Sequence, residues 1–585
     1  MSYYYSTNVN VQLLMALLKE HQIKKVIASP GTTNLEFMAS LQHDDYFEVY
    51  SCVDERSAAY MACGLAAESG EPVVITCTEA TASRNYYSGM TEAYHRKLPI
   101  LAVTGLHDYS CVGNLEPQVI DRSVSPNDSM RRKINLPVIK DENDVKQSEL
   151  LINTAILELK RHGGGPVHMN MPWGGAKFDF SVHELPHVRV IHRYTMDDTL
   201  PELKAGKVAV VCGSHNEWTE RQTKAIDHFC AQYDAVVFCD HGSKYYGKYR
   251  VQATLMAYQK LSYDVLQNID LIIHIGEEIG DDNFSKKIRG AAKQTWRVSP
   301  DGEIRDTFKN LSKVFEMQEY QFFEAFVTET GVSKDAYYKE CKALSEKLRG
   351  NLPELPFSSI YVASQVSAKL PENAVIHFGV SDTIRAWNLF ELPATVRSCC
   401  NLGCRGIDGC VSALIGASFA NRSKLYFGVV GDLTFFYDLN SLGNRHVGSN
   451  LRLIVVNNDG GNIFRHNGHP SQVWLGFEEA NKYIAAAGHF GKKSPDLVKN
   501  YAENLGFEYL TASDAKGFEK AMERFVTPEL TEKPMLFEIF TESKNDSNAF
   551  QMMANVDLDA KGQAKAMIKQ VLGEKGIATL RKIIK

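Results

Sequence analysis

The chain contains 585 residues, of which 44% are hydrophobic and 23% charged, with a formal net charge of −6 at pH 7. This composition is ordinary for a folded protein of roughly three to four domains, and it excludes a disordered chain. The acidic balance argues against nucleic acid as a partner, and we expect a cytoplasmic protein because neither a membrane-spanning run nor an apolar leader is present.

The first domain, which we assign to residues 1–185, is predicted to be an α/β unit. Strand-like runs at 25–29, 48–52, 73–77 and 100–104 alternate with helical stretches such as 55–69. Alternation of this kind predicts a parallel sheet covered by helices. Glu55 begins its helix directly after a strand, which is a rigid position for a functional carboxylate. The structural alternative is an acid favoured by the helix dipole.

A second α/β domain is predicted over residues 200–335. The sequence after Pro172 is extended and irregular to about residue 206, and we interpret it as a linker. The runs "KVAVVCG", "DAVVFCD", "DLIIHIG" and "QTWRVSP" then predict four strands separated by helices. The domain is expected to end near a helix over 319–326, and a Pro-marked stretch over 351–359 leads to the next domain.

The third domain, residues 355–545, places polar residues at the ends of two apolar runs. Asp432 follows the run 425–430, and two asparagines follow the run 451–456, with room for one helix between the runs. Two parallel strands joined in this way bring their carboxyl ends together, which is where ligands bind in open parallel sheets. We therefore expect Asp432 and Asn458 to be neighbours. The alternative is an ordinary Asp cap and an Asn-rich turn.

Oxygen ligands in small number suit Mg²⁺, which completes its shell with water and phosphate oxygens. The turn 459–461 can add a backbone carbonyl, and its glycines allow the chain to approach a ligand closely. A helix expected to begin near Asn462 would direct free N–H groups at an anion. The pattern therefore predicts magnesium beside a diphosphate.

Twelve cysteines occur without the compact spacing of a disulfide framework, so we expect reduced thiols. The densest group is Cys399, Cys400, Cys404 and Cys410. Its spacing matches no common zinc pattern, which favours free thiols over a metal site.

The last segment, residues 546–585, is predicted to be a basic helical tail. Lys561, Lys565 and Lys569 fall on one helical face. An anionic surface could bind this face, although a solvated helix packed on its own protein explains the pattern as well.

Two motifs resemble those of thiamine diphosphate enzymes. The segment "GDLTFF…VVNNDGG" is similar to their metal-diphosphate motif, and "VDERSAAYMACGLA" is similar to the segment that bears their catalytic glutamate, here Glu55. Within that superfamily the chain most resembles the menaquinone-pathway synthases of 2-succinyl-5-enolpyruvyl-6-hydroxy-3-cyclohexene-1-carboxylate, on the segments "ASPGTTN", "GPVHMNMPW" and "RGIDG". The resemblance covers nearly the whole chain.

The resemblance implies three doubly wound parallel-sheet domains: pyrimidine-binding, central and diphosphate-binding. It implies thiamine diphosphate and Mg²⁺ as cofactors, with each site shared between copies of a homodimer or homotetramer. Glu55 would share a proton with the aminopyrimidine, and Ile407 would be the wedge that bends the cofactor. The implied cofactor-binding residues are Ile407, Gly431, Asp432, Leu433, Asn458, Gly460, Ile463 and Phe464. Of these, Asp432, Asn458 and Gly460 would hold the metal.

The substrate positions depart from those of the synthases. Ser381 and Arg385 in "GVSDTIRAWN" and Gln118 match substrate-binding residues. Three arginines expected by resemblance are instead Thr33, Leu402 and His107, and each loss removes a bidentate carboxylate anchor. Arg405 could compensate, as could Lys286 with its neighbour Lys287, although an ordinary solvated lysine pair explains these two residues equally well. The candidate substrate residues are therefore Thr32, Thr33, His107, Gln118, Ser381, Arg385, Arg405 and Lys286.

The resemblance implies an enzyme that decarboxylates a 2-oxo acid and transfers the acyl anion equivalent to an acceptor with a new carbon–carbon bond. Its partners would be a small-molecule donor and an acceptor that the sequence does not specify. One alternative is a simple decarboxylase, lyase or hydrolase. Another is a scaffold that binds the cofactor without turnover, which the intact Glu55, Asp432 and Asn458 disfavour.

Overall fold

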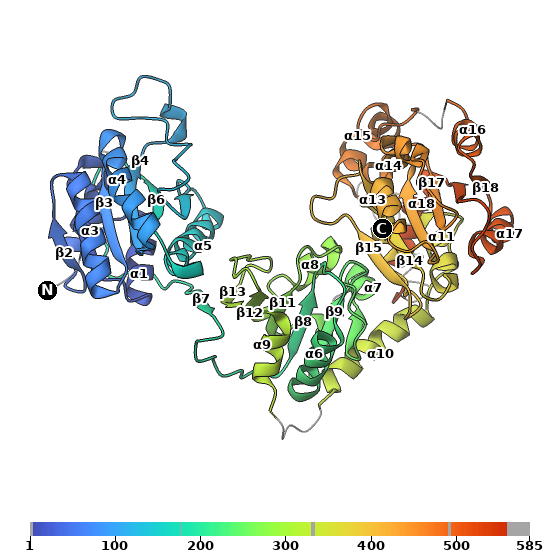
Figure 1. The fold of residues 1–585 in the computed structure, drawn as a ribbon, viewed down its shortest axis with the longest axis horizontal. Helices are drawn as coiled ribbons and strands as arrows, with labels where there is room; N and C mark the ends of the chain where they lie inside the picture. Colours follow the sequence, from blue (N-terminus) through green and yellow to red (C-terminus); the bar gives the residue numbers. More distant parts are fainter. Residues whose placement is uncertain (1–3, 176, 262, 329–333, 490–492, 559–585) are drawn as a thin grey trace, which may run out of the picture. The chain divides into compact units, whose positions relative to one another are not determined.

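The computed structural model describes residues 4–558 except 176, 262, 329–333 and 490–492, and Figure 1 shows its elements. The chain forms two compact units, one built mainly from the residues up to Asp197 and the other mainly from Asp198 onward. Lys561, Lys565 and Lys569 of the predicted basic tail lie outside the described residues.

A six-stranded parallel sheet forms the centre of the first unit, with strand order β2-β1-β3-β4-β6-β5. The predicted strands and the helix from Glu55 are confirmed. Apolar cores lie on both faces, as expected where helices cover both sides of a parallel sheet. The strands are β1 Lys25–Ala28, β2 Glu48–Ser51, β3 Val73–Cys77, β4 Ile100–Leu106, β5 Arg132–Asn135 and β6 Val167–Pro172. The helices are α1 Val9–Glu20, α2 Leu35–Gln42, α3 Glu55–Ser69, α4 Ala80–Arg96 and α5 Glu142–Glu158.

The second sheet has the order β10-β9-β8-β11-β12-β13-β7, and its pairs from β10 to β12 are parallel. The four predicted strands are confirmed. The segment interpreted as a linker contributes β7, so it is not purely a connection. The strands are β7 His192–Tyr194, β8 Val208–Cys212, β9 Ala235–Cys239, β10 Arg250–Gln252, β11 Ile269–Ile275, β12 Ala292–Ser299 and β13 Leu311–Glu316. The helices are α6 Glu220–Tyr233, α7 Thr254–Tyr258, α8 Asp282–Ile288 and α9 Glu319–Phe326, and α10 Ala336–Gly350 follows.

The third sheet is also six-stranded and parallel, with the order β15-β14-β16-β17-β19-β18. β16 and β17 are neighbours in parallel register, as the two apolar runs predict. The strands are β14 Val375–Phe378, β15 Arg397–Cys400, β16 Tyr426–Gly431, β17 Leu451–Asn457, β18 Glu508–Ala512 and β19 Met535–Phe540. The helices are α11 Ser359–Val366, α12 Asp382–Trp387, α13 Cys410–Ser418, α14 Asp432–Tyr437, α15 Pro470–Lys482, α16 Leu497–Asn504, α17 Ala515–Phe525 and α18 Ser543–Met553. The three parallel α/β sheets confirm the predicted fold class.

Two expected helices differ from the prediction. The connection from β16 to β17 is the short α14 followed by a 3₁₀ helix over Leu439–Gly443, because buried Asp438 turns back to accept hydrogen bonds from the Ser412 backbone and hydroxyl. Asn462 begins only a four-residue 3₁₀ helix. It ends at Arg465, and Gly468, three residues further on, has a φ of +88° in the left-handed region, so the long helix expected from Asn462 does not form.

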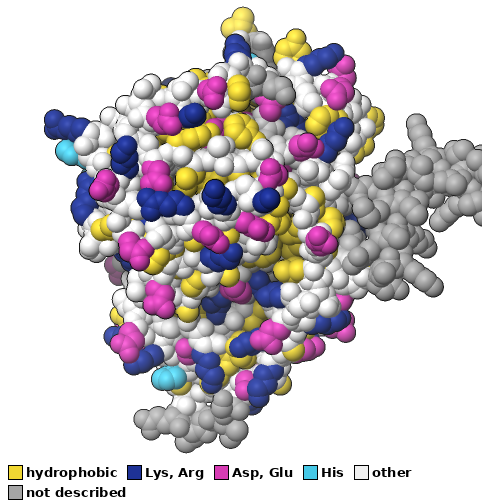
Figure 2. Space-filling view, turned by 90° about the vertical axis from the view of Figure 1, so that its right-hand side faces the viewer, with side chains coloured by type: hydrophobic (Ala, Val, Ile, Leu, Met, Phe, Trp, Pro, Cys, Tyr) yellow, Lys and Arg dark blue, Asp and Glu magenta, His cyan; other side chains and the backbone are white. Residues whose placement is uncertain are grey.

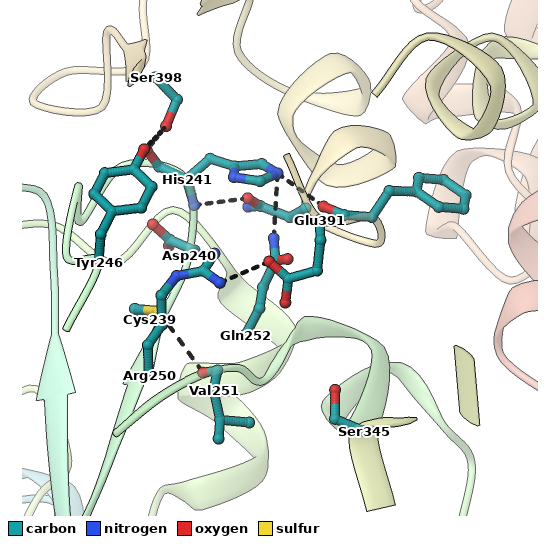
Figure 3. Close-up of polar contacts among 12 residues, drawn as sticks. Cys239, Asp240, His241, Tyr246, Arg250, Val251, Gln252, Ser345, Glu391 and Ser398 are labelled. Carbon is teal, nitrogen blue, oxygen red and sulfur yellow. Dashed lines mark hydrogen bonds and ion pairs between the residues drawn. The ribbon is translucent and has the colours of Figure 1, made fainter. Parts of the chain in front are cut away.

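A buried polar network fixes the segment that follows α12 (Figure 3). Arg250 Nη1 lies 2.6 Å from Glu391 Oε2, and the Ser398 hydroxyl donates to the His241 carbonyl at 2.7 Å. His241 Nε2 lies 3.0 Å from the carbonyl oxygens of both Trp387 and Phe390. Burial lowers the pKa of His241 to about 4, so this contact is made by a neutral imidazole. The network therefore anchors the end of α12, the helix that carries Asp382 and Arg385.

Charged side chains of both signs are interspersed on the face drawn in Figure 2. A mixed pattern of this kind produces no strong field of one sign.

None of the twelve cysteines is in a disulfide. Among the described residues, no helix combines the length and apolar character needed to cross a membrane.

Candidate active site

A cavity of about 280 Å³ lies at the carboxyl ends of β14, β16 and β17. Its lining brings together five segments from different parts of the sequence: the starts of α11, α12 and α14, the turn before α13 and the loop after β17. Nine of the residues predicted from the sequence line it, namely Ser381, Ile407, Gly431, Asp432, Leu433, Asn458, Gly460, Ile463 and Phe464. The cavity lies where parallel sheets bind ligands.

Asp432 presents a buried carboxylate to this cavity. Its Oδ2 atom accepts a hydrogen bond from the Gly460 N–H at 2.8 Å. Burial raises the pKa of Asp432 to about 7, and the hydrogen bonds from the Gly460 and Leu433 backbones only partly oppose this rise. A divalent cation would offset the cost of the buried charge. The Asp432 environment therefore fits a metal ligand.

The amide of Asn458 is oriented by a second buried acid. Asn458 Nδ2 donates to Asp546 Oδ2 at 2.8 Å, and Asp546 also accepts from the Ser359 N–H at 2.6 Å and the Thr541 hydroxyl at 3.1 Å. Asp546 is fully buried. Because Nδ2 is engaged, the carbonyl oxygen of the Asn458 amide is left as the atom that could bind a cation.

The loop between Asn458 and Gly460 is held in place by Arg465. Its guanidinium donates to the Asn458 carbonyl at 2.9 Å and to the Asp459 carbonyl at 2.6 Å. Gly460 has a φ of +131°, and a Cβ atom there would collide with the Ala485 carbonyl oxygen. Only glycine fits this position, so the loop geometry is fixed by backbone sterics as well as by Arg465.

The cavity also contains polar atoms that have no partner among the described residues. Asn462 is 5% exposed, and neither Oδ1 nor Nδ2 of its amide is hydrogen-bonded; the same holds for the buried Ser359 hydroxyl. Buried polar groups are normally paired, so these atoms indicate a polar ligand. No group of three or more His, Cys, Asp or Glu side chains that could hold a metal occurs in the described part of the chain. A cation here would therefore depend on one carboxylate together with amide and backbone oxygens, a donor set that suits Mg²⁺.

Apolar side chains complete the wall. Ile407, Ile463 and Phe464 line the cavity together with Val380 and Trp387. Such a lining excludes water from a reacting carbon and lowers the local dielectric constant. The cavity thus offers polar groups suited to an anion and a cation together with apolar surface suited to a ring system.

Three other predicted substrate residues do not line the cavity. Arg385 and Arg405 both contact Asp282 of α8, at 3.3 Å and 2.7 Å. Lys286 is exposed on the same helix, and the Lys287 Nζ atom donates to the Gln259 and Leu261 carbonyls. Lys287 therefore has a structural role.

Glu55 lies in the first unit, half-buried at the first position of α3. Its Oε2 atom accepts from Asn85 Nδ2 at 3.1 Å. The preceding Asp54 caps the helix by accepting the Ser57 N–H at 3.2 Å. The cap fixes the start of α3, and with it the Glu55 backbone.

The remaining predicted substrate residues also lie in the first unit. Thr32 and Thr33 form a 3₁₀ turn after β1, in which Thr33 is buried. His107 follows β4, and its backbone N–H and ring Nδ1 lie 2.7 Å and 2.8 Å from Oε2 of buried Glu79. Gln118 is exposed and has a φ of +65°. The substrate-binding roles of these four residues stay predictions.

Four residues beside the cavity were missed by sequence reasoning: Asp282, Asn462, Arg465 and Asp546. Asn462 follows the glycines of "DGGNIF", where a polar residue next to a close-approach turn is a usable signal. Asp546 lies just beyond the carboxyl end of β19, so strand order could have pointed to it. Asp282 and Arg465 act through long-range contacts that no local pattern reveals.

Comparisons with known proteins agree with this geometry. Residues 10–125 match the family described as thiamine pyrophosphate enzyme, N-terminal TPP binding domain, and residues 385–539 match the corresponding C-terminal TPP binding domain. The chain is 32% identical over 557 residues to the 2-succinyl-5-enolpyruvyl-6-hydroxy-3-cyclohexene-1-carboxylate synthase of Bacteroides fragilis, covering 93% of this chain and 98% of that protein. Proteins of the same name match from Phocaeicola vulgatus, at 31% identity (93% and 97% covered), and from Christiangramia forsetii, at 28% (91% and 96% covered).

Proposed function

The chain belongs to the thiamine pyrophosphate enzyme family, and from this premise we propose that it decarboxylates a 2-oxo acid and transfers the remaining acyl group to an acceptor with formation of a carbon–carbon bond. The observation that carries the proposal is the convergence of nine predicted residues on one cavity that is lined by both polar and apolar side chains. The relatives are named synthases, which supports bond formation over simple decarboxylation.

We propose that Mg²⁺ is held by Asp432, by the amide oxygen of Asn458 and by the Gly460 carbonyl, with diphosphate oxygens and water completing its shell. The raised pKa of Asp432 and the Asp546 contact to Asn458 support this assignment. Gly431 and Leu433 would let the backbone approach the diphosphate, and the unpartnered Asn462 amide offers a further donor.

When bound, thiamine diphosphate would supply a nucleophilic carbon that adds to the keto group and accepts the electrons released with CO₂. Ile407 would press against the cofactor and keep its two rings together. Ile463 and Phe464 would exclude water from the reacting carbon. Glu55 would share a proton through its carboxyl oxygen with the cofactor's aminopyrimidine, which is the general acid–base role of a positioned carboxylate.

For the substrate, we propose that Ser381 and Arg385 recognise the oxo-acid donor, with Arg405 and Lys286 nearby in the same unit. Thr32, Thr33, His107 and Gln118 would contribute from the first unit. The Ser381 position on the cavity lining supports the first assignment. Ser381 directly precedes α12, and Arg385 lies on that short helix four residues further along.

We propose that the enzyme is a homodimer or homotetramer in which Glu55 of one copy serves the metal site of another. Two exposed apolar groups support this assembly. Near Glu55, Val53 is 79% exposed and Met61 is 50% exposed; on α15, the exposed fractions are 62% for Val473, 85% for Trp474 and 47% for Leu475. Exposed apolar side chains in groups mark protein interaction sites. We also propose a cytoplasmic location, which the twelve cysteines outside any disulfide support.

The test is to purify the protein, remove any bound cofactor, and titrate thiamine diphosphate with and without Mg²⁺ by calorimetry. Candidate 2-oxo acids are then supplied with and without an aldehyde or enone acceptor, and the products are identified by mass spectrometry. The proposal predicts metal-dependent binding and a ligated product. A protein that binds no thiamine diphosphate contradicts it, and CO₂ release with an aldehyde as the only product would identify a simple decarboxylase.

A further inference from the structure

Two arginines beside the cavity share one carboxylate from the neighbouring helix α8. Arg405 Nη1 lies 2.7 Å from Asp282 Oδ1, and Arg385 Nη2 lies 3.3 Å from Asp282 Oδ2. Arg405 Nη2 also donates to the Ile279 carbonyl at 2.8 Å. Burial opposes ionisation of Asp282, but the two guanidinium groups outweigh it and lower the pKa of this carboxyl. Asp282 therefore already pairs with Arg405 Nη1 and Arg385 Nη2, so Arg385 Nη1 is the atom left for the one carboxylate that every 2-oxo acid carries.

A second acid lies on the cavity side of Arg385. Asp382 lines the cavity, and its Oδ1 atom is buried, 3.7 Å from Arg385 Nη1 and without a hydrogen bond from any described residue. Its Oδ2 atom lies 2.7 Å from His466 Nε2. A carboxylate oxygen accepts hydrogen bonds and donates none when ionised. This position thus repels an anionic group of a ligand and favours one that donates a hydrogen bond.

The acids of this cluster already match its arginines without a substrate. The guanidinium groups of Arg385 and Arg405 face the carboxylates of Asp282 and Asp382, and a third acid, Glu278, places its Oε2 atom 3.9 Å from Arg405 Nη2. Every 2-oxo acid brings the one carboxylate that leaves as CO₂. A second carboxylate on the substrate needs a cation of its own. To reach Arg385 or Arg405, that carboxylate would have to displace Asp282 or lie against Asp382. Like charges brought together in this way weaken binding.

We propose that Asp282 and Asp382 restrict the donor to 2-oxo acids without a second carboxylate, preferably with a chain that is neutral or donates a hydrogen bond. This inference rests on the proposed function and names its substrate class. Lys286, exposed four residues after Asp282 on α8, is the alternative anchor for a second carboxylate.

The experiment compares 2-oxopentanoate with 2-oxoglutarate, which have the same chain length and differ by the terminal carboxylate. With the enzyme loaded with thiamine diphosphate and Mg²⁺, the initial rate of CO₂ release gives kcat/KM for each acid. Binding of each acid is measured separately by calorimetry on the cofactor-free protein. We expect both measurements to favour 2-oxopentanoate by at least about tenfold, the smallest ratio that a like-charge contact of this kind should produce.

Variants identify the residues responsible. Asp282→Asn keeps the size of the side chain and frees the two arginines, so it should narrow the preference at least about fivefold by improving binding of 2-oxoglutarate. Asp382→Asn should also narrow the preference for 2-oxopentanoate. It replaces Asp282→Asn as the test if that variant does not fold. Glu278→Gln is the matched control, because it removes an equal charge that makes only the 3.9 Å contact, and it should change the preference less than twofold.

A kcat/KM for 2-oxoglutarate equal to or above that for 2-oxopentanoate overturns the inference and leaves the proposed function standing. If the parent enzyme prefers 2-oxoglutarate and Lys286→Ala loses that preference, Lys286 is the residue that binds the second carboxylate. If neither acid is decarboxylated, the proposed function fails, and the calorimetric preference alone then decides the inference.

Discussion

Replacing Asp546 with asparagine tests whether this buried carboxylate orients a metal-binding amide. Asp546 accepts hydrogen bonds from the Ser359 N–H, the Asn458 amide and the Thr541 hydroxyl. In Asp546→Asn one carboxylate oxygen becomes an NH₂ group, so at least one donor faces another donor. Leaving one buried donor unpaired costs about 1–3 kcal/mol. If that cost falls on the Asn458 orientation, Mg²⁺ binding should weaken by about 5- to 150-fold, since 1.4 kcal/mol is tenfold.

The assay is calorimetric titration of Mg²⁺ into the protein in the presence of thiamine diphosphate. Thr541→Val is the matched control, because it removes one hydrogen bond to the same carboxylate without placing a donor against Asn458, and it should cost less than about threefold in affinity. Thermal melts followed by circular dichroism establish that both variants are folded. A folded Asp546→Asn protein whose Mg²⁺ affinity lies within twofold of the parent would refute the orienting role.

Three further predictions concern the other parts of the site. Glu55→Gln should lower turnover at least about a hundredfold, the usual weight of a proton-transfer group, while calorimetry finds thiamine diphosphate still bound; unchanged turnover would remove the proposed proton role. Arg385→Ala should raise the Michaelis constant for the oxo-acid donor, and steady-state kinetics with unchanged constants would discard this assignment. The pKa of Asp432 is about 7, above its ordinary value, so the metal-free folded protein takes up a proton as the pH falls through 7. Because the unfolded chain loses this proton at lower pH, the stability of the metal-free protein should fall as the pH rises from about 4 to 7. Since Mg²⁺ needs the ionised form, its apparent affinity should fall about tenfold per pH unit below 7 and level off above it; calorimetry that gives a constant affinity between about pH 5.5 and 8 would contradict this.

Much of the fold follows from local patterns. The runs that became β16 and β17 are short, apolar and buried on both faces, a pattern typical of adjacent parallel strands. Because the carboxyl ends of parallel strands share one edge, Asp432 and Asn458 could be placed together before any coordinates. The expected helix at Asn462 failed, since the glycine at 468 and the contacts of Arg465 limit the segment to a short 3₁₀ turn.

The parts that sequence could not supply are those set by distant contacts. Asp282 is 103 residues from Arg385 and 123 from Arg405, and only the packing of α8 beside both α12 and the turn before α13 brings its carboxylate to the two arginines. Asp546 is 88 residues from Asn458. No periodicity or spacing rule connects such pairs. Only the structure shows that Asp282 pairs with the two arginines and that Asp546 orients the Asn458 amide.

The central claim is that the carboxylate of Glu55 in one copy and the Asp432 cavity of another copy form one site. Complementation between Glu55→Gln and Asp432→Ala tests it most directly. Each variant alone should be inactive, whereas a heterodimer, co-expressed with two affinity tags and purified on both, holds one intact Glu55 and one intact Asp432 in the same site. The account predicts about half of the parental activity per heterodimer, because one of its two shared sites is restored. Activity no higher than that of either variant alone, from a heterodimer that retains thiamine diphosphate, would contradict the shared site.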